Sequence, residues 1–153
     1  MSLTMPTSVT RMNRRPDLLA TFRELPIFRE CTDEELVEID AVADEVAVPA
    51  GRVLVRQGEI GREFVVIIEG SVEIERDGVV VATLEAGAHF GELALLIDHP
   101  RNATATALTD LRIEVIDRRG FQDLLERSHH LTKNLLVSLA KRVSELEDSQ
   151  LEQ

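Results

Sequence analysis

The sequence predicts a mainly β domain flanked by helices, because the hydrophobic period of its 153 residues changes twice along the chain. Apolar residues recur at helical spacing up to about residue 43 and again after residue 120, and short alternating segments fill the stretch between. Turn residues separate six to eight such segments at close intervals, which is typical of an antiparallel barrel or sandwich. A chain of this length buries roughly 70% of its unfolded surface, so it can fold without disulfides or a metal.

The N-terminal region divides near residue 17. Residues 1–16 contain three arginines, two prolines and no acid, so we expect a disordered basic tail followed by a folded domain over residues 17–151. A first helix is expected from residue 18 to residue 22, before the break at Pro26. A second helix should begin after Thr32, because Glu35 completes a capping box with it.

The central segments are bounded by glycine and proline turns. Asp77 and Gly78 separate two β-rich runs, and this pair is a strong hairpin signal because a two-residue turn needs positive φ. The predicted strands cover residues 45–48, 52–55, 64–69, 71–76, 79–84, 103–107 and 111–117.

The C-terminal quarter returns to helical spacing, with segments expected over 121–127 and from 131 to about 151. The second segment contains an apolar seam, about two heptads long, formed by Leu136, Leu139, Val143 and Leu146. Three or four heptads would be needed to indicate a coiled coil by themselves. Two interpretations therefore stay open: the helix packs back on its own barrel, with Leu131 and Leu135 on a second face, or residues 136–146 form a homodimer.

The charge of the chain limits its partners. The net charge is −11, and the body after residue 16 is more acidic still because the tail is basic. Since nucleic-acid affinity rests on cationic side chains neutralising phosphates, we expect no direct DNA binding. The longest apolar runs have five residues, far below a membrane span of roughly 20, so no membrane span is expected. The single Cys31 excludes an internal disulfide and, with no signal-peptide-like apolar stretch at the N-terminus, favours the cytoplasm.

One stretch inside the β region does not alternate. Residues 90–96, FGELALL, predict one or two turns of helix that a glycine opens, and such an N-terminus presents free N–H groups to an anion. Gly91 lets the backbone approach a ligand closely, and Arg101 carries donors that suit a phosphate. Glu92 would accept hydrogen bonds from hydroxyls, as on a ribose. The spacing therefore indicates a phosphorylated sugar.

These residues resemble a known family. The segments FGELAL (90–95) and PRNAT (100–104) are similar to the phosphate-binding cassette of cyclic-nucleotide-binding domains, which include the bacterial catabolite activator protein and the regulatory subunits of cyclic-AMP-dependent kinase. The resemblance extends from about residue 25 to residue 146. It implies an eight-stranded antiparallel β-roll, jelly-roll-like, with N-terminal helices and a long C-terminal helix. It also implies cyclic AMP or cyclic GMP as ligand, with no cofactor.

The resemblance further implies a role for each cassette position. Arg101 would bind the cyclic phosphate and Glu92 the ribose 2′-hydroxyl, while backbone N–H groups complete the phosphate cradle. The implied ligand-binding residues are Gly91, Glu92, Leu93, Ala94, Arg101, Asn102 and Ala103. The implied pocket wall consists of Ile74, Val81 and Ala82, which alternation alone would also place in an ordinary core.

Two positions depart from the family pattern. Asn102 stands where members selective for cyclic AMP usually carry Ala or Ser and those selective for cyclic GMP often carry Thr. Because an amide both donates and accepts hydrogen bonds, the choice of base stays open, with cyclic AMP favoured on family frequency. The C-terminal helix lacks the Thr-Ser pair that contacts adenine in the catabolite activator, and Leu146 and Glu147 fall there instead. We therefore expect a largely apolar base cap.

The sequence thus predicts a cyclic-nucleotide sensor of bacterial type that binds but does not catalyse, and whose C-terminal helix repacks on ligand binding. It contains no nucleophile–base constellation, and its four histidines lack metal-ligand spacing, so we expect no catalytic residues and no metal site. Because the chain ends just beyond the long helix, we expect a stand-alone module acting on a protein effector. Three alternatives stay open: a regulatory domain of a larger effector, a degenerate interaction protein that binds no nucleotide, or action on nucleic acid through residues 11–15 with a partner.

Overall fold

The computed structural model describes residues 10–11 and 18–151. Its strands are β1 (Thr10–Arg11), β2 (Ala43–Val48), β3 (Val53–Val55), β4 (Glu63–Glu69), β5 (Val72–Arg76), β6 (Val79–Leu84), β7 (His89–Phe90), β8 (Thr104–Ala107) and β9 (Leu111–Asp117). Its helices are α1 (Leu18–Glu24), α2 (Asp33–Val42), α3 (Glu92–Leu96), α4 (Arg118–Arg127) and α5 (His129–Leu151), with a 3₁₀ turn η1 (Pro26–Phe28).

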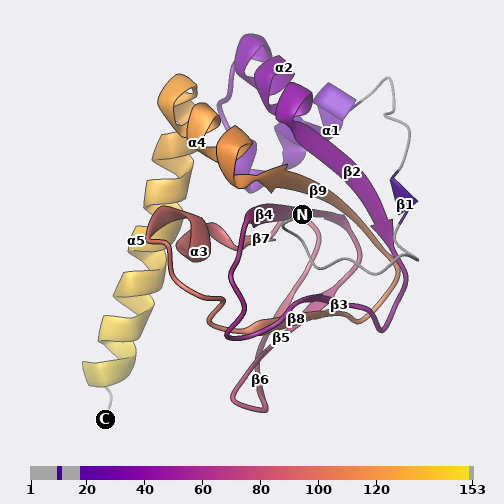
Figure 1. Ribbon diagram of the computed structural model, residues 1–153. Coiled ribbons are helices and arrows are strands. Elements are labelled where there is room, and N and C mark those ends of the chain that lie inside the picture. The colour runs from indigo at the N-terminus through magenta and orange to yellow at the C-terminus, as the bar shows by residue number, and fades with distance from the viewer. Residues whose placement is uncertain (1–9, 12–17, 152–153) are drawn as a thin grey trace.

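The strands form two antiparallel sheets that face one another (Figure 1). One sheet has the order β1-β2-β9-β4-β7 and the other the order β3-β8-β5-β6. Strands β2 to β9 confirm the predicted eight-stranded antiparallel β-roll. Of the predicted basic tail, Thr10–Arg11 pairs with β2 as the short strand β1. The rest of residues 1–16 and residue 17 lie outside the described residues, where disorder stays a prediction.

Local sequence signals explain most element boundaries. The capping box at the start of α2 is confirmed, since the Thr32 hydroxyl accepts from the Glu35 amide at 3.1 Å and the Thr32 amide donates to the Glu35 carboxylate at 2.8 Å. Asp77 and Gly78 both have positive φ, 53° and 80°, and join β5 to β6 in the predicted hairpin. Strand β7 has only two residues and no alternation, and the sequence did not predict it.

The core has two parts, on the two faces of the β2-β9-β4 sheet. Side chains such as Val65 and Ile113 fill the interior of the roll, between the sheets. Phe64 and Ile116 point to the opposite face, where helices α1, α2, α4 and α5 cover them. Neighbouring residues of a strand point to opposite faces, and in these strands both sets are apolar. Both sides of this sheet are therefore apolar.

Helix α5 runs along the outside of the roll (Figure 1). Its N-terminal half packs on the core through Leu131 and Leu135, which are 0% and 3% exposed, and this confirms that the helix packs on its own domain. Leu139, from the predicted seam, is also packed against this core. In contrast, Leu136 and Val143 are exposed.

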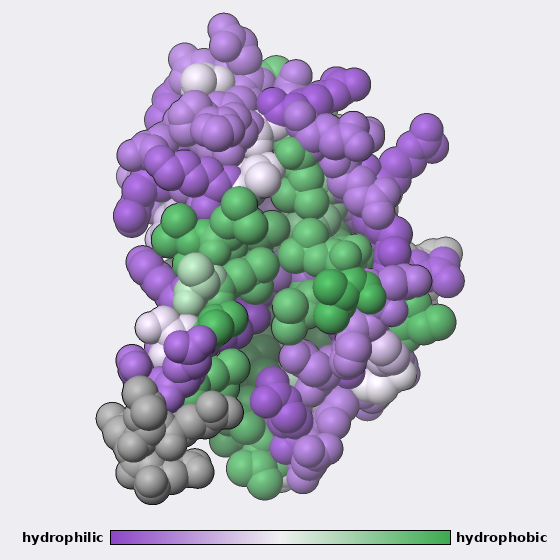
Figure 2. All heavy atoms as spheres, turned by 90° about the vertical axis from the view of Figure 1, so that its left-hand side faces the viewer, coloured by the Kyte–Doolittle hydropathy of each residue, from purple (hydrophilic) through white to green (hydrophobic). Residues whose placement is uncertain are grey.

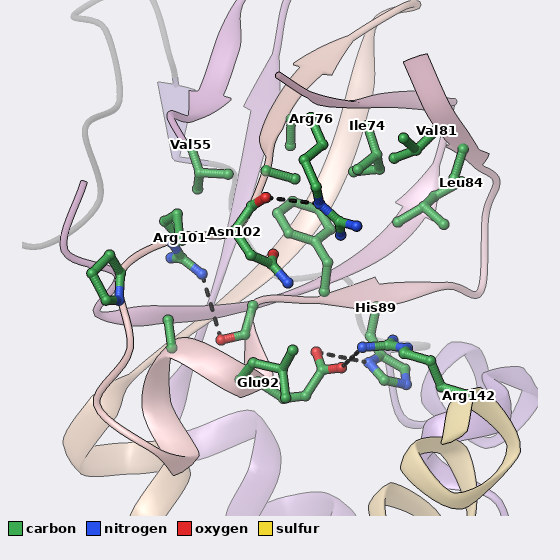
Figure 3. Close-up of a pocket in the computed structure, with 18 of the residues that line it drawn as sticks. Val55, Ile74, Arg76, Val81, Leu84, His89, Glu92, Arg101, Asn102 and Arg142 are labelled. Atoms are coloured by element: carbon green, nitrogen blue, oxygen red, sulfur yellow. Dashed lines mark hydrogen bonds and ion pairs between the residues drawn. The ribbon is translucent and has the colours of Figure 1, made fainter. Parts of the chain in front are cut away.

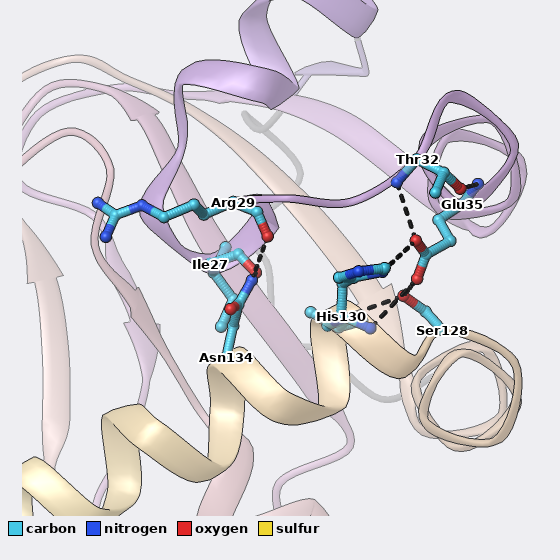
Figure 4. A network of polar contacts seen from close by, with 8 residues as sticks. Ile27, Arg29, Thr32, Glu35, Ser128, His130 and Asn134 are labelled. Atoms are coloured by element: carbon cyan, nitrogen blue, oxygen red, sulfur yellow. Dashed lines mark hydrogen bonds and ion pairs between the residues drawn. The ribbon is translucent and has the colours of Figure 1, made fainter.

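Polar contacts fix the start of α5 to the N-terminal helices (Figure 4). The Glu35 carboxylate accepts hydrogen bonds from the Ser128 hydroxyl and from the His130 backbone and ring. Burial alone would raise the pKa of Glu35. These hydrogen bonds, together with the one from the Thr32 amide, outweigh burial and lower the pKa to about 2. The Asn134 amide donates to the Ile27 carbonyl at 3.0 Å. The first turns of α5 are therefore anchored, which sets the direction of the rest of the helix.

Candidate functional site

A pocket of about 820 Å³ lies between the β5–β6 wall, α3, the segment 100–103 and α5 (Figure 3). This volume is in the usual range for small-ligand sites. All of the residues predicted from the sequence line it: Ile74, Val81, Ala82, Gly91, Glu92, Leu93, Ala94, Arg101, Asn102 and Ala103. The structure thus brings the two cassette segments and the predicted wall into one site.

The glycine that opens α3 is required for two reasons. Gly91 has φ of 99°, in the left-handed region, and is the N-cap of the predicted short helix. A Cβ at this position would lie 2.6 Å from Arg101 Nη1 and 2.7 Å from the Glu63 carbonyl oxygen. Another residue here would therefore strain the backbone and displace the arginine.

Arg101 lies in a narrow slot and is only 7% exposed. Gly61 is close on one side, where an added Cβ would lie 2.4 Å from Nε of Arg101, and Gly91 is close on another. The guanidinium donates to the Glu63 carbonyl at 2.9 Å and more weakly to the Gly91 carbonyl at 3.5 Å. Burial lowers its pKa, which Glu63 and Glu92 partly oppose. An arginine nevertheless stays charged in proteins, so the pocket holds a buried cation.

The backbone on either side of Arg101 is fixed by the segment that precedes β4. The Gly58 amide donates to the Arg101 carbonyl and the Arg101 amide donates to the Glu59 carbonyl, both at 2.8 Å. The Gln57 amide donates to the Thr104 hydroxyl at 2.9 Å. These bonds hold the second cassette segment in place.

Glu92 is buried on the opposite side of the pocket, at 1% exposure, between two cationic or ionisable side chains (Figure 3). Arg142 of α5 forms an ion pair with it at 2.9 Å, and Nδ1 of His89 lies 3.7 Å from its other oxygen. Burial raises the pKa of Glu92, but His89, its own helix amide and Arg142 outweigh this and lower the pKa below its usual value. The site therefore presents an ionised carboxylate. The sequence analysis did not identify His89 or Arg142.

The sequence and the fold of this chain are similar to those of known proteins. The sequence profile described as "Cyclic nucleotide-binding domain" matches residues 45–128, which is more than half of the chain. The chain belongs to this family. A catabolite activator protein from Thermus thermophilus superposes on this cyclic nucleotide-binding domain with a TM-score of 0.75 and 28% identity, covering 83% of this chain and 62% of that one.

Two kinase relatives are similar to most of the chain in sequence. A cAMP-dependent protein kinase regulatory subunit of Schizosaccharomyces pombe is 37% identical over 112 residues, covering 72% of this chain and 27% of the relative. A cGMP-dependent protein kinase of Caenorhabditis elegans is 32% identical over 116 residues, covering 76% of this chain and 15% of the relative. The chain therefore spans less than a third of the length of these two relatives.

The α5 side of the pocket corrects one sequence-based expectation. Leu146 lines the pocket as expected, but Glu147 does not, and Arg142 and Glu145 do. The prediction of a largely apolar base cap is therefore wrong, because the helix presents two charged side chains beside the leucine. A helix rotates about 100° per residue, so Glu147 faces a different direction from Leu146.

The wall opposite α5 also contains a cation. Arg76, from the end of β5, lines the pocket, and its Nε donates to the Asn102 carbonyl at 3.0 Å (Figure 3). The neighbouring side chains of this wall, such as Ile74 and Val81, are apolar. This wall of the pocket thus combines apolar side chains with the N–H donors of the Arg76 guanidinium.

We expect Glu63 to make the stability of the domain depend on pH. Its side chain is buried, which raises its pKa to about 7 although Arg101 opposes this. Because this pKa lies above the ordinary value of 4.5, the folded protein holds the Glu63 proton more tightly than the unfolded chain does. The resulting stabilisation of the fold is complete below about pH 4.5 and is lost as the pH rises through about 7. Glu63→Gln should raise the free energy of unfolding by about 1–3 kcal/mol near pH 8.5 and have little effect near pH 4.5. Urea unfolding at both pH values measures this, and an equal difference at both would contradict it.

The single cysteine, Cys31, lies outside the pocket. Burial raises the pKa of the Cys31 thiol to about 11, so it stays protonated, as expected of a structural cysteine. Over residues 10–11 and 18–151, no group of three or more His, Cys, Asp or Glu side chains could hold a metal ion. None of the helices in this part of the chain is long and apolar enough to cross a membrane.

Proposed function

We propose that this domain binds a cyclic nucleotide, with cyclic AMP as the first candidate, and acts as a regulatory module without catalytic activity of its own. The observation that carries this proposal is the placement of Arg101 and Glu92 in one pocket. Arg101 is a buried cation held by backbone carbonyls, and Glu92 is a buried carboxylate that directly follows Gly91, the glycine beside the Arg101 guanidinium. A cyclic nucleotide carries one anionic phosphate beside one free ribose hydroxyl, which matches this pair.

The chemistry of each ligand part supports specific contacts. Arg101 would donate two parallel N–H bonds to the cyclic phosphate, and backbone N–H groups of residues 91–94, 102 and 103 would add to them. Glu92 would accept a hydrogen bond from the ribose 2′-hydroxyl. The base would lie against the apolar wall of Ile74, Val81 and Ala82. The contacts that bind the anionic phosphate are therefore all local. A protein with a net charge of −11 needs such local contacts, because its overall charge repels an anion.

Calorimetric titration with cyclic AMP and with cyclic GMP tests this function directly. We expect binding of one nucleotide per chain, and much weaker binding of adenosine 5′-monophosphate, which lacks the cyclic diester and carries more charge. Failure of both cyclic nucleotides to bind at millimolar concentration would instead support the alternative of a family member that keeps the fold without the ligand.

Arg76 favours cyclic GMP as a second candidate. Guanine presents two adjacent acceptors, O6 and N7, that suit the fork of an arginine, whereas adenine presents a donor beside its acceptor. Arg76 and Asn102 both line the pocket and lie next to each other. Arg76→Ala should therefore lower the affinity for cyclic GMP more than that for cyclic AMP. An equal effect on both nucleotides would leave cyclic AMP as the better candidate.

Helix α5 is the element that we expect to respond to the ligand. Arg142 joins it to Glu92, and Leu146 lies at the pocket, so a nucleotide that engages Glu92 also alters the contacts of the helix. Hydrogen exchange should show ligand-dependent protection of amides between about residues 128 and 146. Protection confined to residues 91–103 at saturating ligand would contradict the proposed response of the helix.

The exposed face of α5 supports the proposal of a homodimer. Figure 2 shows apolar side chains gathered over the face that lies at the left of Figure 1, where α5 runs. Leu136 and Val143 of the predicted seam are 62% and 54% exposed. Lys133 and Glu147 flank them at opposite ends of the seam, so an antiparallel copy would place opposite charges side by side.

Charged substitutions in this seam should therefore separate the dimer. We expect the Leu136→Glu, Val143→Glu double variant to sediment as a monomer, because a dry interface does not tolerate unpaired carboxylates. Leu139 is left unchanged, since it packs against the domain core. Val37→Glu, at an equally exposed site on α2, is the matched control and should stay dimeric. An unaltered protein that is monomeric at high concentration would dispose of the proposal.

The effector of this module is a separate proposal. We expect a protein effector, and the kinase relatives favour a kinase as one candidate. The complete open reading frame distinguishes a stand-alone sensor of the bacterial type from a domain of a larger effector.

A further inference from the structure

Arg118, the first residue of helix α4, makes contacts that the helix itself does not require. Its Nη2 donates to the Asp98 carboxylate at 3.0 Å, to the Ala94 carbonyl at 3.2 Å and, more weakly, to the Gly61 carbonyl at 3.4 Å. These acceptors belong to the turn after α3, to α3 itself and to the segment before β4. Arg118 does not line the pocket. One side chain outside the pocket therefore joins three segments beside it.

Two of these acceptors belong to residues that enclose the Arg101 side chain. A Cβ added at Gly61 would lie 2.4 Å from Arg101 Nε and 2.7 Å from the Ala94 Cβ, so the three residues pack closely together. Ala94 is 4% exposed and lines the pocket. Because Arg118 binds the backbone carbonyls of Gly61 and Ala94, it fixes two sides of the slot in which the Arg101 guanidinium lies.

The end of α3 needs such a partner. Ala94 lies in a helix of only five residues, so its carbonyl is among those without an N–H partner inside the helix. Asp98 follows with φ of 52°, a left-handed conformation that costs energy in a residue with a side chain. The Asp98 carboxylate pairs with Arg118 but is 83% exposed, and an exposed ion pair contributes little by itself. We therefore expect the carbonyl contacts to matter most.

Helix α4 gives Arg118 a fixed base. The Asp117 carboxylate accepts from the Gly120 amide at 2.8 Å and caps the helix. Phe121 and Leu124 of the same helix are 1% and 2% exposed in the core. Because α4 is anchored in this way, Arg118 can hold α3 in place rather than move with it.

We propose that Arg118 is a positioning residue of the nucleotide site, which holds Gly61 and Ala94 in the places that orient the Arg101 guanidinium toward the cyclic phosphate. This inference rests on the proposed function, because it assumes that Arg101 binds the phosphate. Ala94 also belongs to the group of backbone N–H donors proposed for the phosphate, so one contact supports both kinds of donor. Loss of Arg118 therefore weakens nucleotide binding although Arg118 makes no ligand contact in our proposal.

Calorimetric titration with the tighter of cyclic AMP and cyclic GMP measures this loss. Arg118→Ala should bind about tenfold more weakly than the unaltered protein, and Arg118→Lys should lose less, because its ammonium keeps N–H donors for the carbonyls. Asp98→Asn removes only the exposed ion pair and should bind within about threefold of the parent. Arg119→Ala, at an exposed site on the same helix, is the matched control and should bind normally.

Two outcomes of these titrations would contradict the inference. An affinity of Arg118→Ala equal to that of Arg119→Ala would show that Arg118 does not support the site. A loss in Asp98→Asn as large as that in Arg118→Ala would show that the ion pair, and not the carbonyl contacts, is responsible.

A double variant shows whether Arg118 acts through Arg101. Arg101→Lys has no planar fork to orient, so adding Arg118→Ala to it should weaken binding by less than about threefold. A merely structural role would instead lower the affinity by the same factor in both backgrounds. If the tenfold loss recurred in full beside Arg101→Lys, the positioning role would be overturned.

Hydrogen exchange without nucleotide tests the contact itself. Amides of residues 92–97 should exchange faster in Arg118→Ala than in the unaltered protein or in Arg119→Ala, and equal exchange would overturn the inference even if the affinity fell. Thermal unfolding of each variant defines the temperatures at which folded proteins are compared. Absence of nucleotide binding by the unaltered protein would refute the proposed function and, with it, the role of Arg118 in binding. The exchange measurement would then decide separately whether Arg118 holds α3.

Discussion

Replacing Arg101 with alanine should weaken cyclic nucleotide binding by roughly 30-fold to several thousand-fold, the largest loss that we expect from one substitution. The guanidinium is the buried cation of the pocket, and loss of one partner from a buried charged contact typically costs about 2–5 kcal/mol. No lysine is placed to replace it, because neither of the two in the chain, Lys133 and Lys141, lines the pocket. Calorimetric titration of the variant measures the loss.

Two further variants show that this loss reflects the phosphate contact. Arg101→Lys keeps the charge but not the planar fork, so its affinity should lie between those of the unaltered protein and Arg101→Ala. Arg119→Ala removes an exposed arginine from α4, outside the pocket, and should bind normally. Thermal unfolding without ligand checks the fold of each variant. An Arg101→Ala protein that is folded and binds as tightly as its parent would end the assignment of this pocket.

Gly61→Ala should reduce nucleotide affinity by at least about tenfold, equal to about 1.4 kcal/mol, although Gly61 makes no ligand contact in our proposal. An added Cβ would lie 2.4 Å from Arg101 Nε and 2.7 Å from the Ala94 Cβ, so the guanidinium must leave its slot. The backbone of Gly61 is not left-handed, so the substitution introduces no strain of its own. The expected effect is therefore specific to the position of the arginine.

Gly51→Ala is the matched control for this prediction. Gly51 has φ of 88° and no atom within 4 Å of an added Cβ, so alanine there introduces backbone strain without any contact. We expect it to lower the melting temperature and leave nucleotide affinity unchanged. If Gly61→Ala and Gly51→Ala affected binding equally, the proposed slot for Arg101 would not control recognition.

The sequence alone determined the features that depend on neighbouring residues. The hairpin at Asp77 and Gly78 follows from the positive φ that such a turn requires, and the start of α2 follows from its capping box. The short helix opened by Gly91 also follows from local chemistry, since a glycine and a break in strand alternation are visible without any partner. The seven predicted ligand-binding residues lie within the two short segments that carry the resemblance, and these residues and the three predicted wall residues all line the pocket.

The tertiary structure alone decided which distant residues meet these segments. Arg142 lies on the far half of α5, and its contact with Glu92 depends on the direction that the helix takes. That direction is set by Leu131 and Leu135 in the core and by the polar anchors at the start of the helix. Heptad spacing shows that a helix has an apolar side but not which neighbour that side meets. The same limit applies to Gly61, His89 and the corrected base cap, because contacts between residues far apart in the chain arise only from how the elements pack.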